Sequence, residues 1–124
     1  MRYGKKKCVE QGKSVSKLQE VMRYISENYN ADITLQDAAD MAFMERTYFS
    51  RCFKQIAGFG FNEYLTHTRL RVAEQLLQYS GLSISDISDR CGFSSSNYFC
   101  DVFKRAHNGM SPTEYRKTAG HLLS

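Results

Sequence analysis

The chain has 124 residues and a formal net charge of +4, from 17 lysine and arginine residues against 13 aspartate and glutamate residues. This length accommodates one compact domain or two very small ones. An apolar content of 42% with 13% aromatic residues excludes a disordered chain, and no apolar run reaches the length of a membrane span.

The positive charge is concentrated at the N-terminus. Residues 1–17 carry six basic residues and one acid, for +5, whereas residues 18–124 carry 11 basic residues and 12 acids, for −1. The body of the chain is almost neutral, so nucleic-acid binding must be argued from local placement of charge. We interpret residues 1–14 as a basic tail or interdomain linker, with a disordered basic arm that touches DNA as the alternative.

Apolar residues recur at spacings of three and four, and this pattern predicts an all-α fold of seven helices. The expected helices span 15–29, 35–42, 45–57, 62–79, 84–91, 95–107 and a final segment that begins at Pro112. Thr34 with Asp37, and Ser83 with Asp86, have the spacing of helix-capping boxes. Ser111 and Pro112 have the residue types of an N-cap and a first helical position.

An internal repeat covers most of the body. Thr34-Leu-Gln-Asp corresponds to Ser83-Ile-Ser-Asp at an offset of 49 residues. Tyr48-Phe49-xxx-Phe53-Lys54 corresponds to Tyr98-Phe99-xxx-Phe103-Lys104 at an offset of 50. Gly58 and Tyr64 correspond to Gly109 and Tyr115 at an offset of 51, so one residue is added in each of two loops.

Each repeat consists of a short capped helix, a tight turn and a longer helix with an aromatic inner face, which is the layout of a helix-turn-helix. We therefore expect two helix-turn-helix subdomains joined by an 18-residue helix of roughly 27 Å. A single chain could then supply both of the recognition helices that usually come from a dimer. The expected boundaries are 15–61 for the first subdomain, 62–79 for the linker helix, 80–120 for the second subdomain and 121–124 for a tail.

The second helix of a helix-turn-helix reads bases in the major groove, which assigns candidate DNA contacts to the helices at 45–57 and 95–107. Arginine can donate two hydrogen bonds to guanine, and Asn97 could pair with adenine in the same manner. Lysine and arginine further along each helix suit phosphates, and the capped helix N-termini offer N–H groups to phosphate oxygens. The candidate base-reading residues are Arg46, Thr47, Ser50, Arg51, Ser96, Asn97, Cys100 and Asp101, and the candidate phosphate contacts are Thr34, Lys54, Ser83, Lys104 and Arg105.

The region from Val15 to Ala119, roughly 105 residues, resembles the DNA-binding domain of the AraC/XylS transcription regulators. The second copy carries most of the resemblance, in Ile84-Ser-Asp-Ile87, Cys91-Gly-Phe-Ser-Ser-Ser-Asn-Tyr-Phe99, Phe103-Lys-Arg105 and Gly109-Met-Ser-Pro-Thr-Glu-Tyr-Arg116. The resemblance implies a cytoplasmic bacterial transcription factor, usually an activator that recruits RNA polymerase. It also implies base contacts at Thr47, Ser50, Arg51, Ser96, Asn97, Cys100 and Asp101.

The sequence departs from the family pattern in three places. Asp101 stands where many members have a basic residue, so we expect the second half to bind DNA more weakly than the first. Asn108 is an extra residue before Gly109. Larger members also have an N-terminal sensing and dimerisation domain, and we expect this chain to be a fragment of such a regulator.

An enzyme is not expected, because the three histidines are scattered and no HExxH, P-loop or dinucleotide motif is present. The four cysteines lack zinc-ligand spacing, which predicts reduced thiols and neither a metal nor a cofactor. The alternative function is a helical protein-interaction module with weak or lost DNA binding, which the near-neutral body and Asp101 favour.

Overall fold

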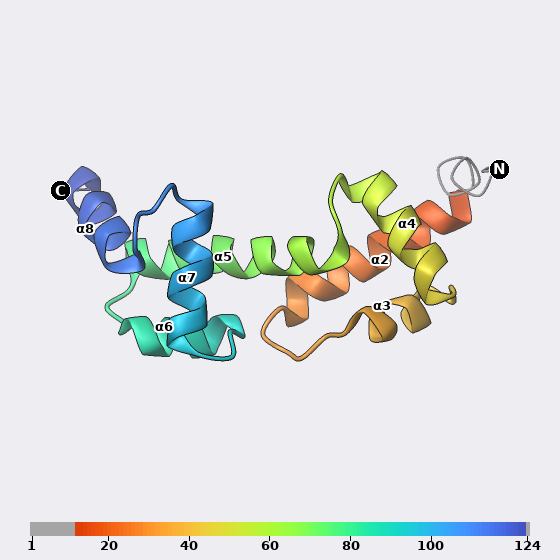
Figure 1. Cartoon of the computed structure of the whole chain (residues 1–124), viewed down its shortest axis with the longest axis horizontal. Helices are drawn as coiled ribbons and strands as arrows, with labels where there is room; N and C mark the ends of the chain where they lie inside the picture. Colours follow the sequence, from red (N-terminus) through yellow and green to blue (C-terminus); the bar gives the residue numbers. More distant parts are fainter. Residues whose placement is uncertain (1–11, 124) are drawn as a thin grey trace. The chain divides into compact units, whose positions relative to one another are not determined.

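The computed structural model describes residues 12–123, and the part that it describes is entirely helical (Figure 1). The seven helices are α2 (Gly12–Asn28), α3 (Leu35–Met41), α4 (Arg46–Ala57), α5 (Phe61–Tyr79), α6 (Ile84–Cys91), α7 (Ser96–Ala106) and α8 (Pro112–Leu123). The predicted fold class is confirmed. Four expected starts were wrong: the first helix begins at Gly12 and the helix expected from 62 begins at Phe61. The helices expected from 45 and 95 begin one residue later, because Glu45 and Ser95 are N-caps.

The chain forms two compact units, residues 1–68 and 69–124, and each is described by itself. Helix α5 contributes to both cores. Its residues Phe61 and Leu65 are buried in the first core, whereas Leu70, Ala73 and Leu77 are buried in the second. The helix expected to be a separate linker at 62–79 is therefore also a packing element of each unit.

In the first unit, α4 packs against α2 and α3 (Figure 1). Helix α2 buries a stripe of Leu18, Val21 and Ile25 because these residues recur at spacings of three and four. Two phenylalanines of α4, Phe49 and Phe53, are fully buried with ring centroids 5.6 Å apart. Burial of one such ring stabilises a fold by about 1.5–3 kcal/mol. The phenylalanines shared by the repeats are therefore core residues, whereas Tyr48 is half-buried and Tyr98 is 48% exposed.

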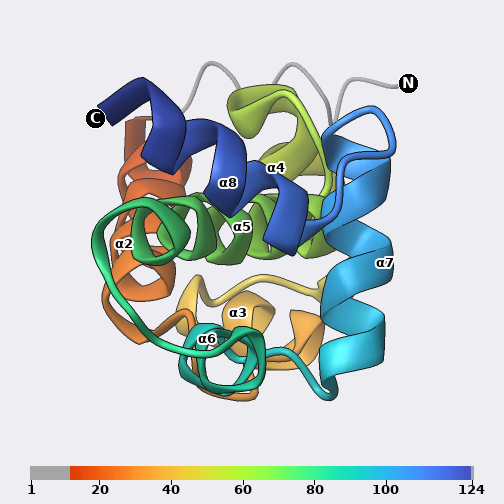
Figure 2. The same ribbon diagram turned by 90° about the vertical axis from the view of Figure 1, so that its left-hand side faces the viewer.

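In the second unit, α7 packs against α6 and α8. Phe99 and Phe103 of α7 are fully buried, and their ring centroids lie 5.8 Å apart, at the same sequence spacing as Phe49 and Phe53. Figures 1 and 2 both show α8 next to the C-terminal end of α5. There Arg116 donates hydrogen bonds to the carbonyl oxygens of Leu77, at 3.1 Å, and Ser80, at 3.3 Å. These bonds satisfy acceptors that a helix end leaves unpaired.

The helix ends follow the capping residues of the sequence. Thr34 and Asp37 form a complete capping box, with bonds of 3.0 and 3.1 Å. Ser111 and Glu114 form the same reciprocal pair at the start of α8, with bonds of 3.1 and 2.9 Å. At the other end of α4, Gly58 adopts a left-handed φ of 94° that glycine tolerates without strain.

Candidate nucleic-acid interface

The turns that precede α4 and α7 have the same backbone hydrogen bonds. In the first copy, the N–H of Phe43 donates to Asp40 O at 3.0 Å, and that of Met44 to Ala39 O at 3.0 Å. In the second copy, the corresponding donors Gly92 and Phe93 bond to Asp89 O at 3.2 Å and to Ser88 O at 3.0 Å. Phe43 and Gly92 both have a left-handed φ, of 56° and 92°. The repeat is therefore preserved in backbone geometry as well as in sequence.

Helix α4 has one buried and one polar face. The buried face consists of Phe49, Cys52 and Phe53. Four of the predicted contact residues are exposed and a fifth, Ser50, is half-buried; the exposed ones are Arg46, Thr47, Arg51 and Lys54. Arg46 and Thr47 lie in the first turn and Lys54 in the last. The order along the helix matches a base-reading N-terminal part followed by a phosphate contact.

Glu45 is the N-cap of α4, a role that sequence reasoning missed. Its carboxylate accepts hydrogen bonds from the N–H groups of Thr47 and Tyr48, both at 3.0 Å. These two bonds hold the pKa of Glu45 below its usual value, because hydrogen bonds to a carboxylate favour its charged form. A negative charge therefore lies at the start of α4. The signal in the sequence was weak, because glutamate is not among the preferred N-cap residues.

Helix α7 repeats this arrangement with a neutral cap. Ser95 Oγ accepts a hydrogen bond from the N–H of Tyr98 at 3.1 Å. Asn97 and Asp101 are exposed, whereas Ser96 and Cys100 are half-buried. All four predicted base-reading residues of the second copy are therefore at least partly exposed on α7, but Ser96 and Cys100 expose less of their surface than Asn97 and Asp101.

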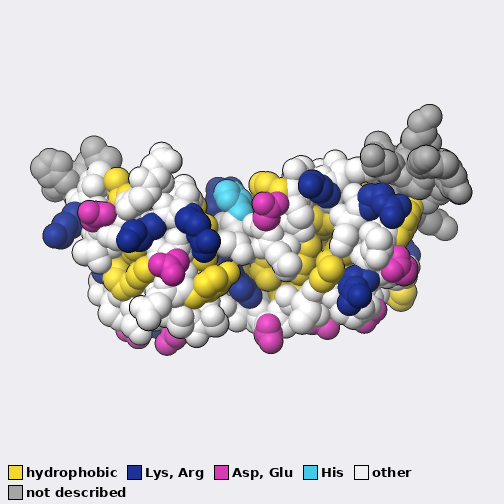
Figure 3. All heavy atoms as spheres, viewed as in Figure 1, with side chains coloured by type: hydrophobic (Ala, Val, Ile, Leu, Met, Phe, Trp, Pro, Cys, Tyr) yellow, Lys and Arg dark blue, Asp and Glu magenta, His cyan; other side chains and the backbone are white. Residues whose placement is uncertain are grey.

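Lys104 and Arg105, the predicted phosphate contacts of α7, lie beside an acidic residue. Asp101, Lys104 and Arg105 line one shallow surface pocket, and all three side chains are exposed. Oppositely charged side chains that lie three or four residues apart on a helix partly neutralise each other's charge. On the face drawn in Figure 3, basic and acidic side chains are likewise interspersed. The structure therefore shows local basic positions and no wholly basic face in this view.

The predicted phosphate contacts Thr34 and Ser83 use their side chains as caps. Thr34 Oγ1 accepts from the N–H of Asp37, and Ser83 Oγ from the N–H of Asp86, each at 3.0 Å. Asp37 also accepts a bond from the N–H of Thr34. At the N-termini of α3 and α6, a phosphate could therefore bind only backbone N–H groups. The carboxylates of Asp37 and Asp86 lie in the first turns of these helices.

The cysteine, histidine and acidic side chains of the described residues are candidates for other kinds of site. No group of three or more histidine, cysteine, aspartate or glutamate side chains there could hold a metal ion. In the same part of the chain, no helix is long and apolar enough to cross a membrane. Cys91 and Cys100 are free thiols, and burial raises the pKa of Cys91 to about 11. Cys52 is disulfide-bonded, so the expectation of reduced thiols was wrong for that residue.

A family model described as a helix-turn-helix domain matches residues 38–118. A transcriptional regulator from Chromobacterium violaceum, described as having an AraC-type DNA-binding domain, is 31% identical with a TM-score of 0.77. The match covers 88% of this chain and 96% of that one. This chain belongs to the AraC-type helix-turn-helix family. The resemblance found in the sequence is thereby confirmed, and the chain is a DNA-binding domain of the transcription-regulator type.

Two further proteins are similar to this AraC-type domain. The DNA-binding domain of AdpA, solved in complex with a target DNA, is 30% identical with a TM-score of 0.78, covering 82% of this chain and 91% of that one. The HTH-type transcriptional activator RhaR of Escherichia coli (strain K12) is 36% identical over 99 residues. Those residues are 80% of this AraC-type domain and 35% of RhaR. The domain spans about a third of the length of the curated relatives it matches.

Proposed function

We propose that this domain recognises a specific double-stranded promoter site by placing α4 and α7 in successive major grooves. The observation that carries the proposal is the repeated turn: the same backbone bonds precede two helices whose N-terminal halves present polar side chains. The solved complex of the related AdpA domain with a target DNA supports it. Two recognition helices on one chain make the proposed site asymmetric, because the two copies differ in their contact residues.

The proposed base contacts differ between the halves. In α4, the guanidinium groups of Arg46 and Arg51 suit the two acceptors of guanine, and Thr47 and Ser50 supply hydroxyls. In α7, Asn97 suits adenine, with contributions from Ser96, Cys100 and Asp101. An aspartate can accept a hydrogen bond from cytosine, but its charge also repels phosphates. We therefore propose that the first half contributes most of the specificity.

The proposed phosphate contacts flank these helices. Lys54 lies in the last turn of α4, and Lys104 and Arg105 lie in the last turn of α7. The N-termini of α3 and α6, at Thr34 and Ser83, offer backbone N–H groups. Such contacts orient a protein on the duplex without reading sequence.

The remaining partners are inferred from the relatives. Because RhaR is named a transcriptional activator, we propose that this domain activates transcription, with RNA polymerase as its partner. A sensing or dimerisation domain is a second proposed partner. The proposed place of action is the bacterial cytoplasm, where promoter DNA is found.

The deciding experiment is selection of bound duplexes from a random-sequence pool, followed by affinity measurements over a range of salt concentrations. We expect an enriched, asymmetric site whose affinity falls steeply with salt, because phosphate contacts release counterions. No duplex binding even at low salt would contradict the proposal and favour the alternative, a helical protein-interaction module.

A further inference from the structure

The two proposed recognition helices, α4 and α7, differ in the residue that caps their N-termini. Glu45 caps α4, and the repeat places Ser95 at the same position before α7. Each cap accepts a hydrogen bond from the N–H of the tyrosine three residues later, from Tyr48 at 3.0 Å and from Tyr98 at 3.1 Å. A serine hydroxyl is enough for this bond, and glutamate is not among the preferred N-cap residues. Capping alone therefore does not account for a glutamate at position 45.

The carboxylate of Glu45 is held in place while part of it stays available. Its Oε1 accepts from the N–H of Tyr48 and its Oε2 from the N–H of Thr47, both at 3.0 Å. A carboxylate has about four lone-pair sites, so these two bonds leave about half of them for another donor. Glu45 is exposed, and its lowered pKa keeps it charged at neutral pH. The start of α4 thus presents a fixed group that can only accept hydrogen bonds.

The chemistry of this group suits one base better than the other three. In the major groove, cytosine presents an N4 amino donor, guanine presents two acceptors, and thymine presents an acceptor and a methyl group. Adenine has an amino donor, but its N7 acceptor lies beside it and would face the same negative charge. An acceptor-only side chain at the start of α4 therefore selects cytosine, just as the guanidinium of the next residue, Arg46, suits guanine.

We propose that Glu45 is a specificity-determining residue of the first half of the DNA interface, where its carboxylate accepts a hydrogen bond from the N4 amino group of a cytosine. The inference rests on the proposed function of α4. Guanine or thymine at that position would direct an acceptor at the carboxylate, so a wrong base meets repulsion as well as a missing bond. Because two backbone bonds already fix the side chain, it has little conformational freedom left to lose on binding.

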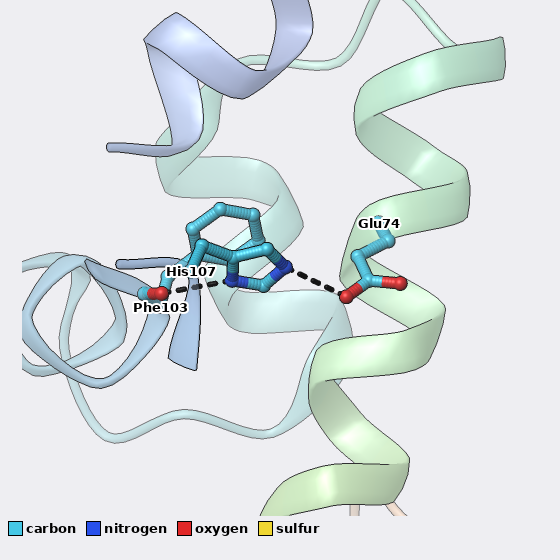
Figure 4. A network of polar contacts seen from close by, with 3 residues as sticks. All are labelled: Glu74, Phe103 and His107. Carbon is cyan, nitrogen blue, oxygen red and sulfur yellow. Dashed lines mark hydrogen bonds and ion pairs between the residues drawn. The ribbon is translucent and has the colours of Figure 1, made fainter. Parts of the chain in front are cut away.

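The same position in the second copy can be exchanged without disturbing how α7 is held. The C-terminal end of α7 is joined to α5 by His107 (Figure 4). Its Nε2 lies 2.8 Å from Glu74 Oε2, and its Nδ1 lies 2.8 Å from the carbonyl oxygen of Phe103. The imidazole also stacks on the Phe103 ring, with centroids 3.8 Å apart. Ser95 is exposed at the opposite end of the helix, so a glutamate there meets none of these contacts.

The variant Glu45→Ser separates the two roles of the side chain. Serine keeps a cap bond, as Ser95 does in the second copy, and removes the carboxylate. Bound duplexes are selected from a random-sequence pool by the unsubstituted protein and by this variant. We expect one position of the site to be enriched in cytosine with the unsubstituted protein and to lose that preference with the variant. Identical enriched sites, or loss of a preference for another base, would overturn the inference.

The size of the effect is measured on two duplexes that differ only in having thymine in place of that cytosine. We expect the unsubstituted protein to bind the cytosine duplex about 10-fold more tightly, and Glu45→Ser to bind both nearly equally. A cap that only stabilises α4, or a charge that only repels phosphates, would change both affinities by the same factor, and that result would overturn the inference. The matched control is Glu20→Gln, which removes an exposed acid from α2 and should keep the preference.

The reciprocal variant, Ser95→Glu, tests the inference without altering α4, and circular dichroism verifies that each variant is folded. It should add a cytosine preference to the second half of the selected site and leave the first half unchanged. A selected site identical to that of the unsubstituted protein would overturn the inference, because the repeat gives both caps the same place before their helices. Absence of any selected duplex with the unsubstituted protein would instead overturn the proposed function, so the two failures are distinguishable.

Discussion

Arg51 is the residue whose proposed role is tested most directly. It is exposed on α4, beyond the first turn and opposite the buried Phe49 and Phe53. We expect Arg51→Ala to cost about 1–3 kcal/mol of binding free energy at the selected site, with little change on random DNA, because a bidentate contact to guanine is lost. Titration of both duplexes at one salt concentration measures this difference. An equal loss on both would make Arg51 a phosphate contact, and no loss would remove it from the interface.

Ser88 gives a prediction about stability. Its side chain is fully buried in α6, and among the described residues no hydrogen-bond partner reaches its hydroxyl oxygen. The repeat places Ala39, also fully buried, at the same position of α3. We expect Ser88→Ala to raise the free energy of unfolding by about 1 kcal/mol, because an unpaired buried hydroxyl is removed. Denaturant titration measures the change, and Ser85→Ala, at an exposed position of α6, is the control.

At the scale of elements, the turn between α3 and α4 contains a strained residue. Phe43 has φ of 56°, is 83% exposed, and contacts the ammonium of Lys17 at 4.7 Å from its ring centroid. Glycine in place of Phe43 relieves the strain of the left-handed backbone conformation. Alanine removes the same ring but leaves that strain in place. We expect Phe43→Gly to be more stable than Phe43→Ala by about 1 kcal/mol, the reverse of their order inside a helix. The melting temperatures of both variants test this prediction. If Phe43→Ala were the more stable variant, residue 43 would not have a left-handed conformation.

The N-cap of α4 predicts a pH-dependent contribution to stability. The hydrogen bonds from Thr47 and Tyr48 lower the pKa of Glu45 in the folded state below the value of 4.5 expected without them. The stabilisation is therefore present above that pH and is lost as pH falls through the lowered pKa. We expect Glu45→Gln to be less stable than the unsubstituted protein at pH 7, with the difference shrinking toward pH 3. Melting temperatures at both pH values test this, and Glu20→Gln, an exposed acid of α2, should show no such convergence.

The elements that sequence could predict are those fixed by local chemistry. Thr34, Ser83 and Ser111 lie directly before helices, and Gly58 ends one, because caps and left-handed ends depend on neighbours along the chain. The predicted contact residues of α4 and α7 reach the surface because helical periodicity places them opposite the phenylalanines. What could not be predicted depends on partners distant in sequence or on disfavoured conformations. His107 and Glu74 are 33 residues apart, and phenylalanine rarely adopts the φ of Phe43.

For the whole molecule, charge predicts how binding responds to salt. The charged side chains proposed as phosphate contacts in the described body are Lys54, Lys104 and Arg105, and the last two share a surface pocket with Asp101. Each phosphate contact contributes about −0.9 to the slope of log affinity against log salt, so three contacts give a slope of about −3. We expect Lys54→Ala to bring the slope closer to zero by about 1. A slope near zero for the unsubstituted protein would contradict phosphate binding altogether.

The same measurement separates the two interpretations of the basic N-terminal segment. This segment, with Lys5, Lys6 and Lys7, lies outside the described residues. If it is a linker, replacing these three lysines with alanine leaves the salt slope of the selected duplex unchanged, because no phosphate contact is lost. If it is an arm on the DNA, the slope moves toward zero by about 3. We expect the first result, because the proposed contacts lie on two folded recognition helices, and Lys54→Ala is the control that shows what loss of one contact looks like. A change of three would instead assign about half of the electrostatic binding to the tail and leave the near-neutral body with an equal share.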